Sequence, residues 1–334
     1  MPGYERLLRP LLFTLPAEPA HTLAQRALRS RVVGSLLATR TPADPSLACD
    51  LAGLSCPNPV GLAPGLDKDG RLLPSLLRMG FGYVTVGSIT PLPRPGNPRP
   101  RLVRYPSQRA IGNSMGLPSL GAVRAAQLLR RPRPSGPPVI VNVTGFGVAE
   151  IKETVDRLAP YADALEIGLI CPNTDEAGEL GEVRMLRELL TELGPAEGRP
   201  VFVKLPPYHD ETERRLTLEL LDVCAQAGIA GVSVSGTRVE PQPALATGRG
   251  SLAGAPVFPD TLRIVTELAA RQTGLAIKAS GGVMTGADAA RLLDAGATTV
   301  EVYSAFIYRG PRVARTLCEE LLAVRRSAAA AGPE

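Results

Sequence analysis

The sequence contains no tryptophan, and its aromatic residues make up only 4% of 334 positions. Surfaces that stack sugars or single-stranded nucleic acids need exposed aromatic rings, so this shortage argues against both kinds of platform. Histidine is also scarce, because His21 and His209 are the only two in the chain. Two histidines are too few for most histidine-based metal sites. We therefore expect neither a bound metal nor a nucleic-acid partner.

Cysteine pairs and long apolar runs are missing as well. The five cysteines are odd in number and scattered, without a CxxC pair. This usage indicates reduced thiols in a cytoplasmic protein rather than a disulfide framework or a zinc site. No run of eighteen apolar residues occurs, and no secretory signal is recognisable. We expect a cytoplasmic protein that is soluble or lies peripherally on the inner face of the cell membrane.

Short apolar runs, in contrast, recur along the chain from residue 59 onward. Helical patterns such as "DETERRLTLELLDVCAQAG" and "GADAARLLDAGA" separate most of them. The runs are too uniformly apolar for a sheet with one wet face, which favours a buried parallel sheet. Eight strand–helix units predict an α/β fold, a (β/α)8 TIM barrel, with a doubly wound open sheet as the alternative. The predicted strands cover residues 59–65, 82–88, 138–145, 164–170, 200–206, 230–236, 275–280 and 298–304.

Residues 1–45 differ from the rest and read as a small N-terminal helical extension, with the barrel over 46–334. "YERLLRPLLFTL" and "HTLAQRALRSRVVGSLLATR" predict two amphipathic helices joined at "PAEPA". The first forty residues carry six Arg against two Glu. A basic amphipathic helix pair can lie on an anionic membrane. A peripheral membrane contact through residues 1–40 and a cap packed on the barrel both stay open.

Polar or small residues follow each predicted strand, where the chemistry of such barrels gathers. Two of these segments, "KASGGVMTG" and "VYSAFIYRGP", follow the seventh and eighth strands. Loops at this place commonly hold a phosphate through backbone N–H groups. Gly281 and Gly282 let a ligand approach closely, and Ser304 adds a hydroxyl. Two ordinary tight turns are the alternative.

Two of the four lysines lie at strand ends, and so does one cysteine. Lys68 follows the first strand and Lys204 lies within "FVKLPPY". A lysine there is costly unless it faces a polar ligand. Cys171, in "CPNT", ends the fourth strand, and neighbouring cations would draw its thiol toward the thiolate. The pattern predicts a base or nucleophile beside positive charge.

Six segments together resemble the dihydroorotate dehydrogenase family over nearly the whole chain. They are "NPVGLAPGLDKDG", "GFGYVTVGSITPLPRPGNPRPRLVRYP", "AIGNSMGLPSLGA", "CPNT", "FVKLPPY" and "EVYSAFIYRGP". The N-terminal segment is similar to the helical extension of the membrane-associated, quinone-reducing class. The resemblance implies an FMN-dependent dehydrogenase acting on a CH–CH bond, a small-molecule substrate, and a quinone or another electron acceptor.

The resemblance also implies roles for residues. Cys171 takes the position of the catalytic base, under a lid of roughly residues 172–183, and Lys68 bridges flavin and substrate. The implied cofactor-binding residues are Ala63, Gly65, Lys68, Ser88, Asn142, Lys204, Ser235, Gly254, Gly281, Gly282, Tyr303 and Ser304. The implied substrate-binding residues are Asn113, Met115, Gly116, Gly168, Asn173, Thr174 and Gly236. Arg104 matches an arginine of the quinone tunnel.

The chain departs from the family at two kinds of position. Cys171 stands where the quinone-reducing class has serine, which leaves the electron acceptor open. Gly168 and Gly236 stand where the family has substrate-reading amides, and both changes are expected to open space. Each lost amide removes about 1–3 kcal/mol of matched hydrogen bonding. We therefore expect retained flavin chemistry on a related or bulkier substrate. Genuine dihydroorotate oxidation is the alternative, with Ser235, Thr237 or water replacing the amides.

Two further readings are less consistent with the sequence. "IKASGGVMTGADAARLLDAGAT" is similar to the seventh-strand region of deoxyribose-phosphate aldolase, so Lys204 and Lys278 could support Schiff-base chemistry without flavin. A non-enzymatic protein that only binds FMN or a membrane partner is the other.

Overall fold

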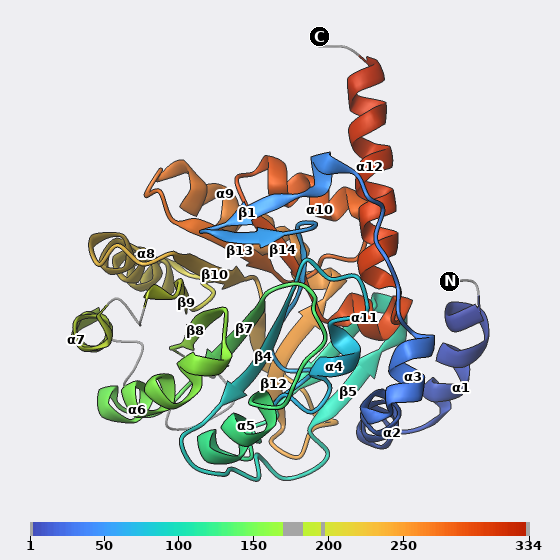
Figure 1. Cartoon of the computed structure of the whole chain (residues 1–334), viewed down its shortest axis with the longest axis horizontal. Helices are drawn as coiled ribbons and strands as arrows, with labels where there is room; N and C mark the ends of the chain where they lie inside the picture. The colour runs from blue at the N-terminus through green and yellow to red at the C-terminus, as the bar shows by residue number, and fades with distance from the viewer. Residues whose placement is uncertain (1–2, 170–182, 195–197, 332–334) are drawn as a thin grey trace.

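Eight parallel strands close into a barrel in the computed structural model, which describes residues 3–169, 183–194 and 198–331 (Figure 1). Pairing of the last strand with the first, Val300 with Val60, closes the ring. Seven strands lie within a predicted run and β4 extends one residue beyond its own, so the (β/α)8 barrel is confirmed and the open sheet is wrong. The barrel strands are β3 (Val60–Leu62), β4 (Tyr83–Ile89), β7 (Val139–Val143), β8 (Ala164–Gly168), β9 (Val201–Lys204), β10 (Gly231–Ser235), β13 (Ala276–Ser280) and β14 (Thr299–Val302).

Helices cover the outside of the barrel, and local side chains fix where some begin. Asp210 accepts hydrogen bonds from the first-turn amides of α8, and Thr285 with Asp288 forms a capping box on α10. The helices are α4 (Leu73–Leu76), α5 (Ala122–Leu129), α6 (Val148–Leu158), α7 (Val183–Leu193), α8 (Glu211–Gln226), α9 (Phe258–Ala270), α10 (Gly286–Asp294), α11 (Ser304–Arg309) and α12 (Val313–Ala331).

Two smaller sheets were not predicted. The hairpin of β1 (Cys49–Leu51) and β2 (Leu54–Cys56) precedes the first barrel strand. A four-stranded antiparallel sheet contains β5 (Leu102–Tyr105), β6 (Ala110–Asn113), β11 (Arg238–Pro241) and β12 (Arg249–Gly254), in the order β11-β12-β6-β5. Its strands belong to the segments after β4 and β10, so they lie at the carboxyl end of the barrel and shape the mouth.

The N-terminal residues are helical, as predicted, and pack against the barrel. They form η1 (Tyr4–Leu8), α1 (Arg9–Thr14), α2 (Ala17–Arg29) and α3 (Arg31–Leu36). The Tyr4 hydroxyl donates to the Ile307 carbonyl at 2.7 Å, and the Phe13 ring meets that of Tyr308 edge-on at 5.5 Å. Their outer side keeps Leu7, Leu11, Val32 and Leu36 67–75% exposed. A membrane contact of this surface remains a prediction.

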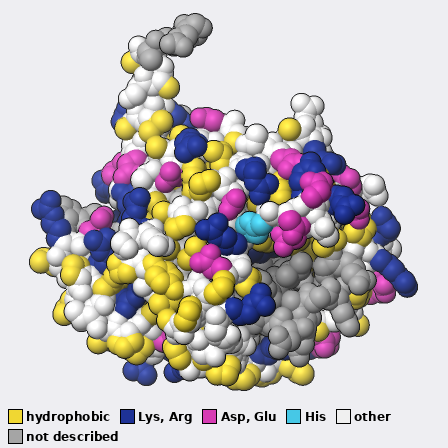
Figure 2. All heavy atoms as spheres, turned by 180° about the vertical axis from the view of Figure 1, so that it is seen from behind, with side chains coloured by type: hydrophobic (Ala, Val, Ile, Leu, Met, Phe, Trp, Pro, Cys, Tyr) yellow, Lys and Arg dark blue, Asp and Glu magenta, His cyan; other side chains and the backbone are white. Residues whose placement is uncertain are grey.

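Helix length and the distribution of surface charge bear on what a membrane span and a nucleic-acid surface require. Within the described ranges, no helix is both long and apolar enough for a membrane span. On the face shown in Figure 2, basic side chains are interspersed with acidic and apolar ones. This face therefore carries no continuous basic field of the kind that tracks a nucleic-acid backbone.

Candidate active site

A cavity of about 280 Å³ opens at the carboxyl ends of the barrel strands. Predicted site residues from seven of the eight strand ends, and from β6 and β12, line it. The lining includes Ala63, Gly65, Lys68, Ser88, Asn113, Met115, Gly168, Lys204, Ser235, Gly254, Gly281, Gly282, Tyr303 and Ser304. Most of the site residues expected from the sequence therefore line the same cavity.

The glycines after β13 form a tight cradle at one end of this cavity. Gly281 and Gly282 have φ angles of +110° and +82°, which residues other than glycine rarely adopt. A Cβ on Gly282 would lie 2.6 Å from the backbone of Phe258, and one on Gly281 would lie 2.7 Å from Thr261 Oγ1. Ser304 begins α11 beside them. Glycine is therefore required here, and the bare backbone suits a phosphate.

Asn142 does not line the cavity, although it was predicted to contact the cofactor. It is fully buried in β7, and its Nδ2 donates to Glu166 Oε1 at 2.6 Å. Asn142 Oδ1 is the one buried side-chain polar atom of the described residues without a hydrogen-bond partner. An unpaired buried acceptor typically costs about 1–3 kcal/mol. Its amide lies near Gly168, on the cavity wall, so a donor from a bound group can satisfy it.

Beneath the cavity lies a buried ion cluster that the sequence reading missed. Lys278 Nζ lies 2.6 Å from Glu166 Oε2 and 3.1 Å from Glu301 Oε1, and all three side chains are inaccessible to solvent or nearly so. Ser233 and Asn142 donate further hydrogen bonds to Glu166. The cluster crosses the barrel interior from β8 to β13 and β14, and Glu301 also lines the cavity.

Burial and pairing set the charges of this cluster. Burial alone would lower the pKa of Lys278, but Glu166 and Glu301 outweigh it and raise that pKa. Burial alone would raise the pKa of Glu166, and the Lys278 charge reverses the shift to a lowered pKa. For Glu301 burial wins and raises the pKa. Lys278 is thus a paired ammonium rather than a free amine, which speaks against the aldolase reading.

The two substituted amide positions differ in the room they leave. A Cβ on Gly168 would meet nothing nearer than 3.6 Å, so this glycine does open space. A Cβ on Gly236 would lie 2.5 Å from the Thr261 amide nitrogen, and Gly236 does not line the cavity. The expectation that Gly236 opens space is wrong, because α9 packs against it. Gly116, predicted to contact the substrate, is also absent from the lining, and a Cβ there would lie 2.2 Å from Asn97 Oδ1.

Hydroxyl groups take up part of the polar lining near these positions. Thr144 Oγ1 donates to the Gly168 carbonyl at 2.8 Å, and the hydroxyls of Ser235 and Thr237 lie 3.0 Å apart. All three residues line the cavity. Thr144 and Ser251 were missed by the sequence reading, although Thr144 lies near the end of the predicted strand 138–145. Cys171, Asn173, Thr174 and the predicted lid at 172–183 lie outside the described residues, except for Val183, which begins α7.

A second, apolar cavity of about 80 Å³ lies between the N-terminal helices and the barrel. Phe13, His21 and Arg104 line it, and Leu102, Ile111 and Tyr303 belong to the walls of both cavities. The Arg104 guanidinium lies 4.3 Å from the Phe13 ring and donates to the carbonyls of Leu12 and Leu15. Arg104 therefore holds α1 against the barrel as well as facing the cavity.

Burial also sets the charge of His21 in this second cavity. Burial and, to a smaller extent, the Lys68 charge together lower the pKa of the imidazole to about 4. The His21 side chain in the cavity wall is therefore uncharged near neutral pH. A neutral side chain at this position suits an apolar ligand.

A barrel with a glycine-lined loop after β13, two lysines at the mouth and an adjoining apolar cavity fits the class of phosphate-binding (β/α)8 barrel enzymes. The family profile described as dihydroorotate dehydrogenase matches residues 46–324. The chain belongs to the dihydroorotate dehydrogenase family, whose members are FMN-dependent oxidoreductases acting on CH–CH bonds.

Relatives and solved structures cover nearly the whole chain. It is 36% identical to a dihydroorotate dehydrogenase (quinone) of Chloroflexus aurantiacus, over 96% of each chain. It is 38% identical to one of Clavibacter sepedonicus, over 97% of this chain and 99% of that one. The crystal structure of DHODH from Eimeria tenella in complex with ferulenol superposes with a TM-score of 0.85 at 30% identity, covering 95% of each chain.

Proposed function

We propose that this chain is a quinone-linked dihydroorotate dehydrogenase that holds FMN in the barrel mouth. The observation that carries the proposal is the common wall of the two cavities, formed by Leu102, Ile111 and Tyr303. A polar compartment for a charged substrate and an apolar one for a quinone thus lie side by side. This arrangement suits two half-reactions that share one electron carrier. The quinone-linked relatives support the same assignment.

The residues present fit FMN. Gly281, Gly282 and Ser304 line the cavity and would hold its phosphate through their backbone N–H groups. Lys204 would place a positive charge beside the ring, and Asn142 Oδ1 would accept a hydrogen bond from it. When bound, FMN supplies the site that accepts a hydride and passes electrons on.

On the substrate side, Lys68 and Asn113 bind and orient, and Cys171 takes a proton. Lys68 would pair with the substrate carboxylate, while Asn113 donates or accepts at the ring edge. The Cys171 sulfur would remove the proton from the carbon next to a carbonyl, in a site from which water is excluded. Replacing Cys171 with Ala should slow flavin reduction by roughly 100-fold or more while flavin stays bound. Unchanged reduction would remove Cys171 from this role.

A related, bulkier substrate is the second candidate, and Gly168 favours it. The open space at Gly168 leaves room for a substituent where the family has an amide. Ser235 and Thr237 favour dihydroorotate, since one hydroxyl of this pair can replace a lost amide donor. The similarity to quinone-linked dihydroorotate dehydrogenases also supports dihydroorotate, which is therefore the substrate we propose.

The test is a visible spectrum of the purified protein followed by anaerobic addition of dihydroorotate. A bound flavin absorbance that dihydroorotate bleaches, and that a quinone analogue then restores, is the expected result. A colourless protein that takes up no FMN would contradict the cofactor assignment. A flavin that dihydroorotate leaves oxidised would favour the second candidate. Restoration only by NAD⁺ or fumarate would contradict the quinone assignment.

A further inference from the structure

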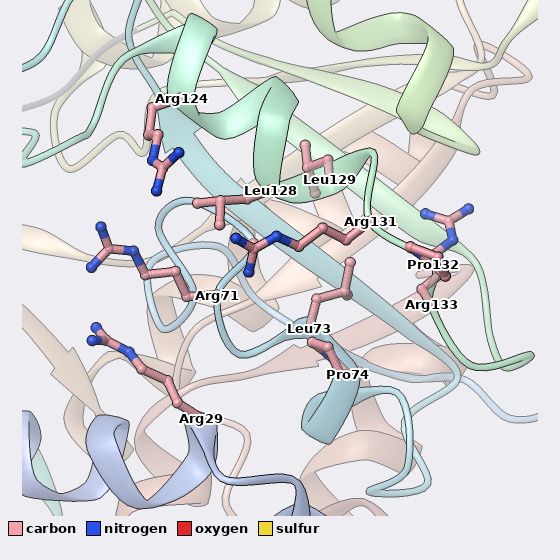
Figure 3. A pocket seen from close by; sticks show the side chains of 11 residues that line it. Arg29, Arg71, Leu73, Pro74, Arg124, Leu128, Leu129, Arg131, Pro132 and Arg133 are labelled. Atoms are coloured by element: carbon pink, nitrogen blue, oxygen red, sulfur yellow. The ribbon is translucent and has the colours of Figure 1, made fainter.

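A second concave site lies on the outside of the barrel, away from the mouth. It has a volume of about 310 Å³, and five arginines line it. They come from separate parts of the chain: Arg29 ends α2, Arg71 follows β3, Arg124 lies in α5, and Arg131 and Arg133 follow α5. Figure 3 shows Arg71, Arg124 and Arg131 around one part of the site, with Arg29 below them and Arg133 at the opposite end.

Four of these five charges lack an acidic partner. Arg133 Nη2 lies 3.0 Å from Asp163 Oδ2, and Arg124 donates only to the neutral amide of Gln127. Among the described residues, no carboxylate forms an ion pair with Arg29, Arg71, Arg124 or Arg131. Elsewhere on the surface arginines do pair, as Arg157 does with Glu153 and Arg315 with Glu319. Gathering like charges without counter-charges is unfavourable until an anion binds.

The floor of the site is apolar, and it lies close to the loop after β3 that carries Lys68. Leu73, Leu128 and Leu129 are buried beneath the arginines. A Cβ on Gly70 would lie 2.8 Å from Leu129, so the loop packs tightly on α5. Asp67 Oδ1 accepts from the amides of Gly70 and Arg71 at 3.0 and 2.9 Å. Lys68, in the same loop, lines the active-site cavity.

We infer that this arginine pocket binds the phosphate group of a multiply charged phosphate ester. Guanidinium groups bind phosphate oxygens through paired, charge-assisted hydrogen bonds, and several together match more than one negative charge. The bound anion would join Arg29 of the N-terminal extension to Arg71 of the Lys68 loop. The phosphate can come from a soluble ester or from a lipid headgroup. Val32 and Leu36, 69% and 75% exposed just after Arg29, give the headgroup source its basis.

Calorimetric titration of the full-length protein with pyrophosphate tests the soluble source. The variant Arg71→Gln/Arg131→Gln removes two pocket guanidiniums, and Arg130→Gln/Arg312→Gln makes the same charge change at exposed arginines outside the lining. We expect the pocket variant to bind pyrophosphate at least tenfold more weakly, a change of about 1.4 kcal/mol, and the control variant to match the wild type. Circular dichroism and unfolding confirm that both variants fold.

Flotation with vesicles tests the headgroup source. Vesicles containing phosphatidylglycerol are compared with vesicles of phosphatidylcholine alone. Loss of binding to anionic vesicles in the pocket variant but not in the control variant would support the pocket as a headgroup site. The inference is overturned if neither probe binds the wild-type protein. It is also overturned if both variants lose binding equally, because the loss would then come from the lower net charge of the protein and not from the pocket.

Discussion

At the scale of single residues, the barrel interior depends on one lysine. Lys278 is the cation between two buried carboxyl groups, and its removal would leave Glu166 with its charge unpaired. Sequence reading noticed Lys278 but assigned it to carbonyl chemistry, because its partners are 112 and 23 residues away. A signal was present, since "ALEIG", "AIKAS" and "TVEV" each carry one charged residue in an apolar strand.

Replacing Lys278 with Met should lower the free energy of unfolding by about 3–5 kcal/mol. The matched control is Lys152→Met, because Lys152 forms an exposed ion pair with Asp156 on α6. That change should cost about 0.5 kcal/mol or less. Urea unfolding at neutral pH measures both. Equal losses in the two variants would show that the buried cluster adds no stability beyond a surface pair.

Gly282→Ala should weaken FMN binding at least tenfold and lower stability. The added Cβ meets the Phe258 backbone at 2.6 Å and must displace the start of α9. Gly274→Ala is the control, because Gly274 also has a positive φ, +76°, but nothing within 4 Å. It should carry only the strain of the left-handed backbone, about 1–2 kcal/mol, without a change in flavin affinity. A similar loss of flavin affinity in both variants would contradict the role of Gly282 in holding the phosphate.

His21 should make stability fall at low pH. Its pKa in the folded protein is about 4, below the ordinary 6.5, so the unfolded chain takes up the proton first as pH falls. The stability tied to the neutral imidazole is present above pH 6.5 and lost toward pH 4, up to about 3 kcal/mol. In His21→Gln, unfolding at pH 7 and pH 4.5 should show a smaller decline than in the wild type. An equal decline in stability in the two proteins would mean that a group other than His21 titrates in this range.

At the scale of secondary-structure elements, the sequence predicted the barrel strands well and the second sheet not at all. Uniform apolar runs identify strands such as β7 and β10 locally, since both faces are buried. The pairing of β6 with β12 joins residues about 140 positions apart, and "RGSLAG" carries no period that predicts it. Non-local antiparallel pairing is what local patterns cannot specify.

The contact between α1 and β5 depends on Arg104. Replacing Arg104 with Met should remove its hydrogen bonds to Leu12 and Leu15 and loosen the wall of the apolar cavity. We expect the KM for quinone to rise about tenfold, while reduction of the flavin by substrate stays within about twofold. Stopped-flow measurement of the two half-reactions separates these effects. A slower reductive step with unchanged quinone kinetics would place Arg104 on the substrate side.

At the scale of the whole molecule, the two cavities with a common wall are the basis of the proposed function, with separate sites for substrate and quinone. The sequence predicted the polar mouth from strand ends, because every parallel strand delivers its last residues to the same side. The volume left at Gly168 and the close packing at Gly236 depend on neighbours in β7 and α9, so sequence alone could not distinguish them. The sequence identified both positions, and the structure shows that only Gly168 leaves room for a side chain.

The most direct test of two compartments is product inhibition by orotate, measured while dihydroorotate and a quinone analogue are varied in turn. Separate cavities with a common wall predict that orotate competes with dihydroorotate but not with the quinone. Competition between orotate and the quinone would mean that both enter one pocket, and it would contradict the account.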